Sequence, residues 1–492
     1  MKDKLNKYVI EGTNYFKQNN FSQASLIFKK ALKKFPDQYA LYTYLIPCLI
    51  NQYKYEEALI YAKKFHQTNT MLEFSSIYLG IIYFQTTQLN LSLQYFDKVL
   101  NINSENYNAL VNKAAALNKL DRNLEAKQLL DKALTIDPSG SVAYRNYAAI
   151  YEDDFELKKA EEFYIKAIQI NKKDHQSIFA LSQMQLSNKN YEEGWRNFEH
   201  RWLKGTMNYR FSQIRRLTNL NDIEGKKILV WHEQGLGDTI QFSRYVRHLI
   251  QLGANIVFEV QKPLIKFLRL QFDCEVTGEI SDTNFDYQSP LLSLPLLFRN
   301  EKENFKFAGP FFYCSLEKVN AWKERLNLSK HKLNLGITIS GNTKQINEDR
   351  RKIPLDYFID FLEFSKIFII QKDISNLELD LIKQHDDLIF LGNDKNWENM
   401  TDTSAILQNM DFLVSIDTSI IHLAGSMNKD CLLLLSKPAE WRWAQSNENM
   451  PKWYESVRVI RQSKRRDWDT ILNAVNIVLK EQFKNKNMKK VN

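Results

Sequence analysis

Cysteine is scarce in this chain of 492 residues, with four residues that lie far apart and form no CxxC pair. This spacing fits neither a disulfide scaffold nor a structural zinc site, and it is typical of a reducing compartment. No apolar run approaches the length of a membrane-spanning helix, and the N-terminal MKDKLNKYVIEG lacks the apolar core of a signal peptide. We therefore expect a soluble, cytoplasmic protein with no membrane span.

Glycine is also used sparingly, at 15 residues, whereas 44% of the residues are hydrophobic and 13% aromatic. This composition is ample for packed interiors and argues against a disordered chain, and the length predicts two or three domains. The net charge of +9 is typical of a solvated, lysine-rich surface. No arginine-aromatic cluster stands out, so we expect no nucleic-acid partner, although a positive field attracts anionic ligands such as nucleotides.

A period of 34 residues runs through the first two hundred residues. Small residues recur at fixed phases of this period, and aromatic or long aliphatic residues recur at others. Members of the set are Gly12, Tyr15, Ala24, Phe28, Ala31 and Pro36; Gly80, Tyr83, Ser92, Phe96 and Val99; Ala114, Leu117, Ala126, Leu130, Ala133 and Pro138; and Ala148, Tyr151, Ala160, Tyr164 and Ala167. A coincidental bundle would not hold phase through five units, so we predict an α-solenoid of about six units over residues 1–205.

The units resemble tetratricopeptide repeats. Arrays of this kind usually present a concave groove, so the resemblance implies a possible peptide or protein partner in the groove. Asn112 and Asn146 lie one repeat apart. They either hydrogen bond to a bound backbone or are ordinary exposed helix residues, and we favour the second interpretation.

After Trp202 the period changes, and apolar strand-like runs alternate with amphipathic helical segments. This alternation predicts βαβ units around parallel sheets, with ligands beyond the carboxyl ends of the strands. The prolines of DYQSPLLSLPLLF indicate loops in that stretch. The predicted parts are a first Rossmann-like domain at 222–315, a linker helix at 316–332, a second Rossmann-like domain at 333–480 and a basic tail at 481–492.

The stretch WHEQGLGDTIQF, at 231–242, places two of the few glycines directly after a strand-like run. A dinucleotide-binding loop is one interpretation, with Glu259 near the acidic ribose position, but Ile240 stands where GxGxxG needs its third glycine. A tight turn with Asp238 as the N-cap of the following helix is the purely structural interpretation.

Three stretches carry a resemblance as a set: HEQGLGDTIQFSRYV, ISGNTKQINEDRRKIPL and VSIDTSIIHLAGS…EWRW. In this order they resemble bacterial proteins that join tetratricopeptide repeats to a domain similar to the heptosyltransferases of glycosyltransferase family 9. The similarity covers roughly residues 225–480. It implies a GT-B fold of two Rossmann-like domains, the first on the acceptor side and the second on the donor side. It also implies inverting, metal-independent transfer of a sugar from a nucleotide-sugar, without a cofactor, to a hydroxyl of a glycan or protein.

On the acceptor side, the resemblance implies that Asp238 is the general base toward the acceptor hydroxyl. A base needs only hydrogen-bond reach to that hydroxyl and a suitable pKa. Gly235 and Gly237 would let the acceptor approach the backbone closely.

On the donor side, Asp417, Thr418 and Ser419 follow the strand-like run DFLVSI and open a helix. A helix N-terminus offers free N–H groups to a pyrophosphate, and His422 lies on the first turn. The alternative is that the three polar residues cap the helix and that His422 is packed in the core.

The loop after LNLGITIS supplies Asn342, Arg350 and Arg351. This loop either closes on the diphosphate and neutralises the charge of the leaving group, or is a solvated charged loop, which is the commoner case for an arginine pair. Where a histidine is expected in the family this chain has Gln345, which puts a catalytic role of that position in doubt. Trp441 and Trp443 either border a sugar or base pocket or pack at a domain boundary.

Two alternatives to a general glycosyltransferase stay open. One is a scaffold whose repeats bind a partner and whose transferase-like half is degenerate. The other is transfer onto protein side chains, with the repeats holding the acceptor, which rests on analogy. A nicotinamide-dependent dehydrogenase ranks last because its fingerprint is incomplete.

Overall fold

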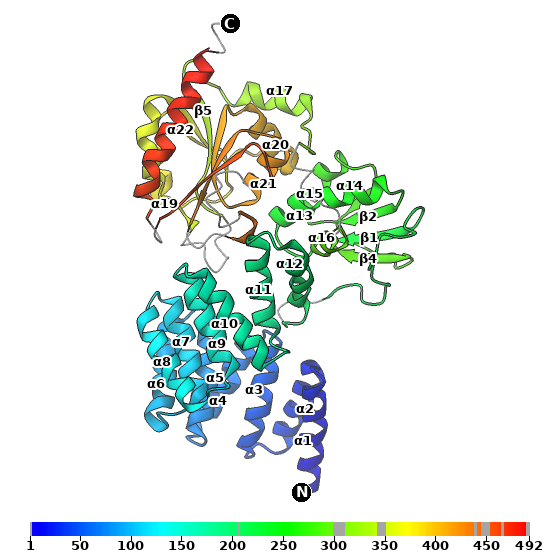
Figure 1. The fold of residues 1–492 in the computed structure, drawn as a ribbon, viewed down its shortest axis with the longest axis vertical. Helices are drawn as coiled ribbons and strands as arrows, with labels where there is room; N and C mark the ends of the chain where they lie inside the picture. Colours follow the sequence, from blue (N-terminus) through cyan, green and yellow to red (C-terminus); the bar gives the residue numbers. More distant parts are fainter. Residues whose placement is uncertain are drawn as a thin grey trace. The chain divides into compact units, whose positions relative to one another are not determined.

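The computed structural model describes residues 2–204, 207, 209–298, 310–341, 351–436, 440–443, 453–463 and 467–488 (Figure 1). The chain forms two compact units. The first comprises Met1–Leu181 with His200–Met207, and the second comprises Ser182–Glu199 with Asn208–Asn492.

Paired antiparallel helices build the first unit, and each helix packs mainly on its sequence neighbours. They are α1 (Lys2–Lys17), α2 (Phe21–Lys34), α3 (Tyr42–Asn51), α4 (Tyr55–Gln67), α5 (Leu72–Gln85), α6 (Leu89–Ile102), α7 (Tyr107–Lys119), α8 (Asn123–Ile136), α9 (Ser141–Asp153), α10 (Leu157–Ile170) and the start of α11 (His175–Ser187). The predicted helical solenoid is confirmed.

The turn inside each helix pair shows the 34-residue period in the backbone. A non-glycine residue with positive φ, between 58° and 67°, closes the first helix of every pair, at Asn19, Tyr53, Thr87, Asp121, Phe155 and Lys189. Successive members of this set are 34 residues apart in the sequence. The period therefore sets the turn geometry as well as the apolar pattern.

Small residues at the predicted phases allow close helix packing. A side-chain carbon on Gly12 would lie 2.5 Å from the ring of Phe28, and one on Gly80 would lie 2.5 Å from the ring of Phe96. Ala24, like the two phenylalanines, is fully buried. The glycine and the aromatic ring of one repeat thus form a matched pair across its two helices.

The second unit contains two parallel sheets. The smaller sheet has the order β3-β2-β1-β4, formed by β1 (Lys227–Trp231), β2 (Asn255–Glu259), β3 (Glu275–Thr277) and β4 (Tyr287–Pro290). Helices α13 (Leu236–Phe242), α14 (Arg244–Gln251) and α15 (Lys262–Arg269) connect its strands. Strand β4 corrects the prediction of loops in DYQSPLLSLPLLF, because its prolines do not interrupt the pairing of Tyr287–Pro290 with β1.

The larger sheet has the order β10-β9-β8-β5-β6-β7, and all neighbours are parallel. Its strands are β5 (Leu333–Thr338), β6 (Ser365–Ile369), β7 (Leu388–Phe390), β8 (Phe412–Ile416), β9 (Cys431–Leu435) and β10 (Val457–Arg461). Numbered within the sheet, this is the doubly wound order 3-2-1-4-5-6, and the smaller sheet follows the same order as far as its fourth strand. The predicted α/β architecture with parallel sheets is therefore confirmed.

Helices cover the larger sheet on its faces. The apolar side of α22 (Asp469–Met488) joins β5, β8 and β9 in one core. Helix α22 continues through 481–488, which the sequence pattern assigned to a basic tail, because apolar residues such as Leu479 and Phe483 still pack against this core.

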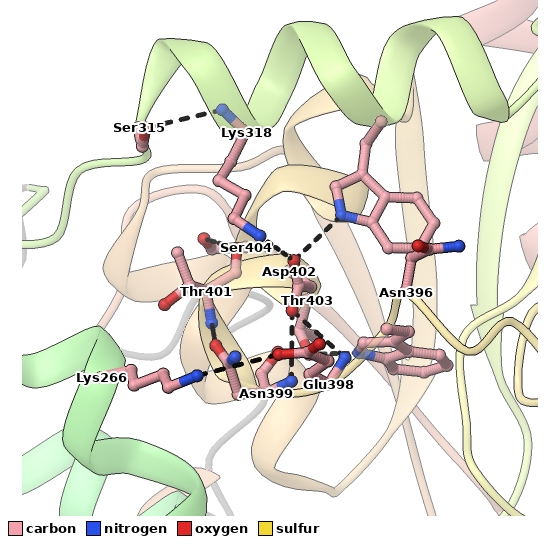
Figure 2. A network of polar contacts seen from close by, with 12 residues as sticks. Lys266, Ser315, Lys318, Asn396, Glu398, Asn399, Thr401, Asp402, Thr403 and Ser404 are labelled. Carbon is pink, nitrogen blue, oxygen red and sulfur yellow. Dashed lines mark hydrogen bonds and ion pairs between the residues drawn. The ribbon is translucent and has the colours of Figure 1, made fainter.

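A buried carboxylate fixes α17 (Leu316–Arg325) to the N-terminus of α20 (Met400–Asn409), as Figure 2 shows. Asp402 is fully buried and accepts hydrogen bonds from Lys318 at 2.9 Å, from the Trp322 ring N–H at 3.3 Å and from two backbone amides. Burial alone would raise the pKa of Asp402, but these hydrogen bonds outweigh it and lower the pKa. The segment predicted as a linker helix is thus packed firmly on the larger sheet's domain.

Two segments lie elsewhere than predicted. Residues 182–199, which the repeat pattern included in the solenoid, pack with the sheets, because the rings of Trp195 and Phe242 meet edge to face in helices α12 (Tyr191–Phe198) and α13. Residues 209–217, assigned to no domain, lie along β4, where Leu217 and Gln288 share a backbone hydrogen bond. No helix in the described ranges is long and apolar enough to cross a membrane.

Candidate functional site

Two polar loops follow the first strand of the smaller sheet and the fourth strand of the larger sheet. One runs from β1 into α13, and the other runs from β8 into α21 (Ser419–Ser426). In doubly wound sheets these are the switch-point positions, where ligands bind beyond the carboxyl ends of the strands. Helices α13 and α21 pack on each other, so the structure brings the predicted acceptor-side and donor-side residues together.

Asp238 lies in the first turn of α13 and uses both carboxylate oxygens. Oδ2 accepts a hydrogen bond from the Gly235 amide at 2.8 Å, and Oδ1 forms an ion pair with Arg442. Gly235 is the N-cap of the helix, so Asp238 occupies the third helical position rather than the N-cap position that the sequence suggested. Its side chain is 16% exposed.

The two glycines of the loop have different surroundings. A side-chain carbon on Gly237 would lie 2.8 Å from His422 Cδ2 and 3.6 Å from Ser419 Cα. At Gly235 it would meet only Asp238 Oδ2, at 3.3 Å. The expected open backbone is therefore present at Gly235, whereas Gly237 allows α13 and α21 to pack closely.

Asp417 and Thr418 lead from β8 into α21. Thr418 is the N-cap, and its hydroxyl accepts a hydrogen bond from the Ile420 amide at 3.3 Å, while Ser419 is the first helical residue. Burial raises the pKa of Asp417, and the Asp238 carboxylate adds to the effect, which the nearby arginines Arg442 and Arg351 only partly offset. Capping is thus one role of this segment, as the structural alternative proposed.

His422 is packed in the interior between the two helices. Its Nδ1 lies 3.0 Å from the Tyr454 hydroxyl, its Nε2 lies 3.8 Å from Asp417 Oδ1, and its ring stacks on Trp443 at 5.1 Å. Burial, with Arg442 and Arg244 nearby, lowers the pKa of His422 far below its usual value. A neutral, packed ring follows, as in the alternative considered from the sequence.

Of the candidate donor-side residues in the polar loop after β5, the structure describes Arg351. Its guanidinium donates a hydrogen bond to the Asp417 carbonyl at 2.9 Å, so it lies beside the β8–α21 loop. Asn342, Gln345 and Arg350 lie outside the described residues.

Glu440 and Arg442 also belong to the site, although no role was predicted for their charges from the sequence. Arg442 forms ion pairs with both Asp238 and Glu440, and its side chain is 10% exposed. Burial raises the pKa of Glu440 to about 7. The negative charges of Asp417 and Asp238 also raise this pKa, whereas the positive charge of Arg442 lowers it. The alternating charges of the motif EWRW are the sequence signal for this pair.

The two tryptophans beside Arg442 serve packing. Trp441 is 5% exposed and meets the rings of Trp195 and Phe198, and Trp443 is fully buried. This outcome agrees with the packing interpretation of the pair. Glu259, considered as a ribose ligand, is also engaged, because Arg210 donates hydrogen bonds to both of its oxygens at 3.0 and 2.9 Å.

Acidic and basic side chains are concentrated where the N-termini of α13 and α21 lie close together. The carboxylates of Asp238, Asp417 and Glu440 surround the guanidinium of Arg442, and Arg351 approaches from the β5 side. Such a cluster can exchange an internal ion pair for an anionic ligand, because a guanidinium binds phosphate and carboxylate with the same geometry.

Fold and site together define a repeat protein that carries a doubly wound α/β unit. A family model described as "Tetratricopeptide repeat" matches residues 107–139. The N-terminal region is accordingly a tetratricopeptide-repeat solenoid. Protein FlbA of Caulobacter vibrioides is 18% identical to the chain over 471 residues, an alignment that covers 82% of this chain and 78% of FlbA.

Several solved structures resemble the chain in part. A tetratricopeptide repeat protein from Parabacteroides merdae has a TM-score of 0.32 and 18% identity, with 41% of this chain and 79% of that chain covered. A thermophilic TPR protein of Thermus thermophilus has a TM-score of 0.34 and 16% identity, with coverage of 37% and 99%. YrrB, titled a TPR protein with an unusual peptide-binding site, has a TM-score of 0.27 and 20% identity, with coverage of 35% and 89%.

Proposed function

We propose that the chain is a protein-binding protein whose tetratricopeptide repeats hold a peptide or protein partner. The observation that carries this proposal is the repeat itself, which keeps its period in both the apolar pattern and the turn residues. Stacked helix pairs form an extended surface that suits an extended ligand better than a small molecule.

The amides of the two asparagines considered for such binding are already used within the solenoid. Asn112 donates a hydrogen bond to the Asn108 carbonyl at 2.8 Å, and Asn146 donates one to the Val111 carbonyl at 2.8 Å. These contacts support the interpretation that both residues are ordinary polar residues of their helices.

Partner capture tests the protein-binding proposal. The full chain is used as bait with cross-linking and peptide mapping, beside a version that lacks residues 1–174. We expect cross-links from a captured protein to fall on the repeats and to disappear with the deletion. Cross-links that fall only on the sheet unit, in both baits, would contradict the proposal.

A second function is favoured by the convergence of Asp238, Asp417 and Arg442 at the switch points of two doubly wound sheets. We propose that the sheet unit is a glycosyltransferase of GT-B type that uses a nucleotide-sugar and a hydroxyl acceptor on a glycan or protein. In this proposal Arg351 and Arg442 oppose the charge of the departing diphosphate. Binding of the diphosphate would take Arg442 from the carboxylate of Glu440, while its ion pair with Asp238 remains.

A thermal-shift screen with ADP-, UDP-, GDP- and dTDP-linked sugars tests the transferase proposal. A ligand at 100 times its Kd stabilises the folded protein by roughly 2.7 kcal/mol, which is readily measured. We expect one nucleotide class to shift the melting temperature and Arg351→Ala to reduce the shift. Arg458→Gln, which removes an exposed ion pair with Glu481, should leave the shift unchanged. The absence of a shift with every donor would end the proposal.

A further inference from the structure

A histidine, a glutamate and an arginine form a cluster at the carboxyl end of the smaller sheet. His232 directly follows β1, Glu259 is the last residue of β2, and Arg210 comes from the segment that precedes the sheet. His232 Nδ1 lies 2.9 Å from Glu259 Oε2. Arg210 donates to both oxygens of Glu259 and also to the His232 carbonyl, so it holds the backbone and the carboxylate together.

The contacts of Glu259 decide which nitrogen of His232 carries the proton. Burial by itself would raise the pKa of Glu259, but hydrogen bonds from His232 and Arg210 outweigh it and lower the pKa. An ionised carboxylate only accepts hydrogen bonds, so His232 Nδ1 must be the donor. In the neutral ring, Nε2 then keeps its lone pair.

His232 and Asp238 differ in availability, and a third acid–base group, Glu233, accepts a hydrogen bond from the Leu292 amide at 2.9 Å. Both oxygens of Asp238 are engaged, one by Arg442 and one by the Gly235 amide. The side chain of His232 is 23% exposed, and within the described part of the chain Nε2 has no hydrogen-bond partner. The histidine is oriented by the carboxylate and open at its other nitrogen, as a general base requires.

We propose that His232, rather than Asp238, accepts the proton from the acceptor hydroxyl, an inference that rests on the proposed transferase function. The hydroxyl oxygen forms a bond to the anomeric carbon while the bond from that carbon to the diphosphate oxygen breaks. The hydroxyl proton moves to Nε2 of His232, and the diphosphate leaves with the electron pair. The imidazolium so formed is paired with the Glu259 carboxylate, and Glu259 and Arg210 act as positioning residues.

The first experiment needs no donor and uses the full chain. Diethyl pyrocarbonate acylates the unprotonated nitrogen of accessible histidines, and peptide mapping by mass spectrometry resolves each site. We expect His232 to react at least tenfold faster than the buried His422. Glu259→Gln should slow the reaction at His232 several-fold, because the amide can donate to Nδ1 and leave the proton on Nε2. A His232 as unreactive as His422 would overturn the inference.

The second experiment measures hydrolysis of the nucleotide-sugar that gives a thermal shift, with water as the probe acceptor. His232→Gln keeps an N–H donor toward Glu259 but removes the base, so we expect a loss on the order of 10²–10⁴ in kcat with donor binding retained. Asp238→Asn should lose less than tenfold, and His331→Gln, at an exposed histidine, should match the wild type.

The outcomes separate the two proposals. Donor binding with normal hydrolysis by His232→Gln and a large loss in Asp238→Asn would make the aspartate the base and overturn this inference alone. A protein that neither binds nor hydrolyses any nucleotide-sugar would overturn the transferase function itself, and this inference with it.

Discussion

At the scale of single residues, the guanidinium of Arg442 decides the electrostatics of the candidate site. It forms ion pairs with Asp238 and Glu440, and the nearby carboxylate of Asp417 raises the pKa of Arg442 further. Burial raises the pKa values of Asp417 and Glu440, and neighbouring carboxylates add to the effect, because ionising every carboxylate beside one cation leaves uncompensated negative charge. The site is therefore assembled around the guanidinium of Arg442, beside which an anionic ligand can replace a carboxylate.

Removal of this charge should destabilise the sheet unit. Arg442→Gln leaves the carboxylates of Asp238 and Glu440, which are 16% and 32% exposed, without their cation, so the cost should approach but not exceed the roughly 3–5 kcal/mol of breaking a fully buried pair. We expect a loss of that order in the free energy of unfolding, measured by urea titration with tryptophan fluorescence. Arg458→Gln, which removes an exposed pair with Glu481 at 3.5 Å, should cost less than about 1 kcal/mol. Equal effects of the two substitutions would show that the cluster carries no special charge coupling.

The stability of the sheet unit should fall as the pH rises from about 5 to 8. Burial raises the pKa of Glu440 to about 7, so the folded state binds its proton more tightly than the unfolded state does. A raised carboxyl pKa contributes stability that is complete below the unfolded pKa and is lost as the pH passes the folded pKa. Glu440→Gln should flatten this dependence by roughly 1–3 kcal/mol across the range, measured by urea midpoints at each pH. An unchanged slope would assign the pH dependence to other groups.

At the scale of elements, the solenoid uses strained turns. The residue that closes the first helix of each pair has positive φ and is never glycine, although non-glycine residues lose roughly 1–2 kcal/mol in this conformation. Thr87, which is β-branched, is least suited to its φ of 60°. Asn19 holds the same position with less strain, because asparagine tolerates this conformation.

Glycine at position 87 should stabilise the solenoid. Thr87→Gly removes the clash of the β-carbon, and the entropy cost of glycine offsets part of the gain, so we expect a net increase of about 0.5–1 kcal/mol. Asn19→Gly is the matched control at the equivalent turn and should change stability little. The measurement is the helical melting transition by circular dichroism. A lower melting temperature for Thr87→Gly would mean that its hydroxyl contact to the Thr86 carbonyl outweighs the strain.

At the scale of the whole molecule, the repeat pattern in the sequence extends further along the chain than the solenoid does in the structure. The 34-residue pattern continues to residue 198, yet Trp195 and Phe198 are nearly fully buried against the aromatic rings of Phe242 and Trp441. A chain cut behind these residues would expose them to water. Burial of one such ring is worth about 1.5–3 kcal/mol, which favours association through the exposed surface.

Two truncated proteins test this boundary. Residues 1–187 should be helical and monomeric, because each repeat packs on its neighbours. Residues 1–205 should be equally helical but should self-associate, which light scattering after gel filtration would detect. Trp195→Glu with Phe198→Glu should restore the monomer in the longer protein. A strand-rich circular dichroism spectrum for either protein would contradict the repeat assignment. If both proteins were monomeric, the proposed boundary of the solenoid would be wrong.

The sequence by itself determined the helix pairs, because their contacts join residues fewer than 34 positions apart and leave a period that can be read directly. It also predicted the alternation of strands and helices and the two polar loops after β1 and β8, since these depend on local patterns of apolar residues, glycine and capping side chains. Strand β4 escaped prediction because the prolines near it outweighed its short apolar signal.

Only the tertiary structure decided how the site residues are used. Arg442 is 204 residues from Asp238 in the chain, and no local pattern reveals that their charges meet. In the same way, the ring of His422 leaves no room for a side chain at position 237. His232 is oriented by Glu259 and Arg210, which belong to other segments. Local patterns fix which residues stand at the ends of strands. Which of those residues are paired, packed or left open depends on contacts between distant segments, and the folded chain alone sets those distances.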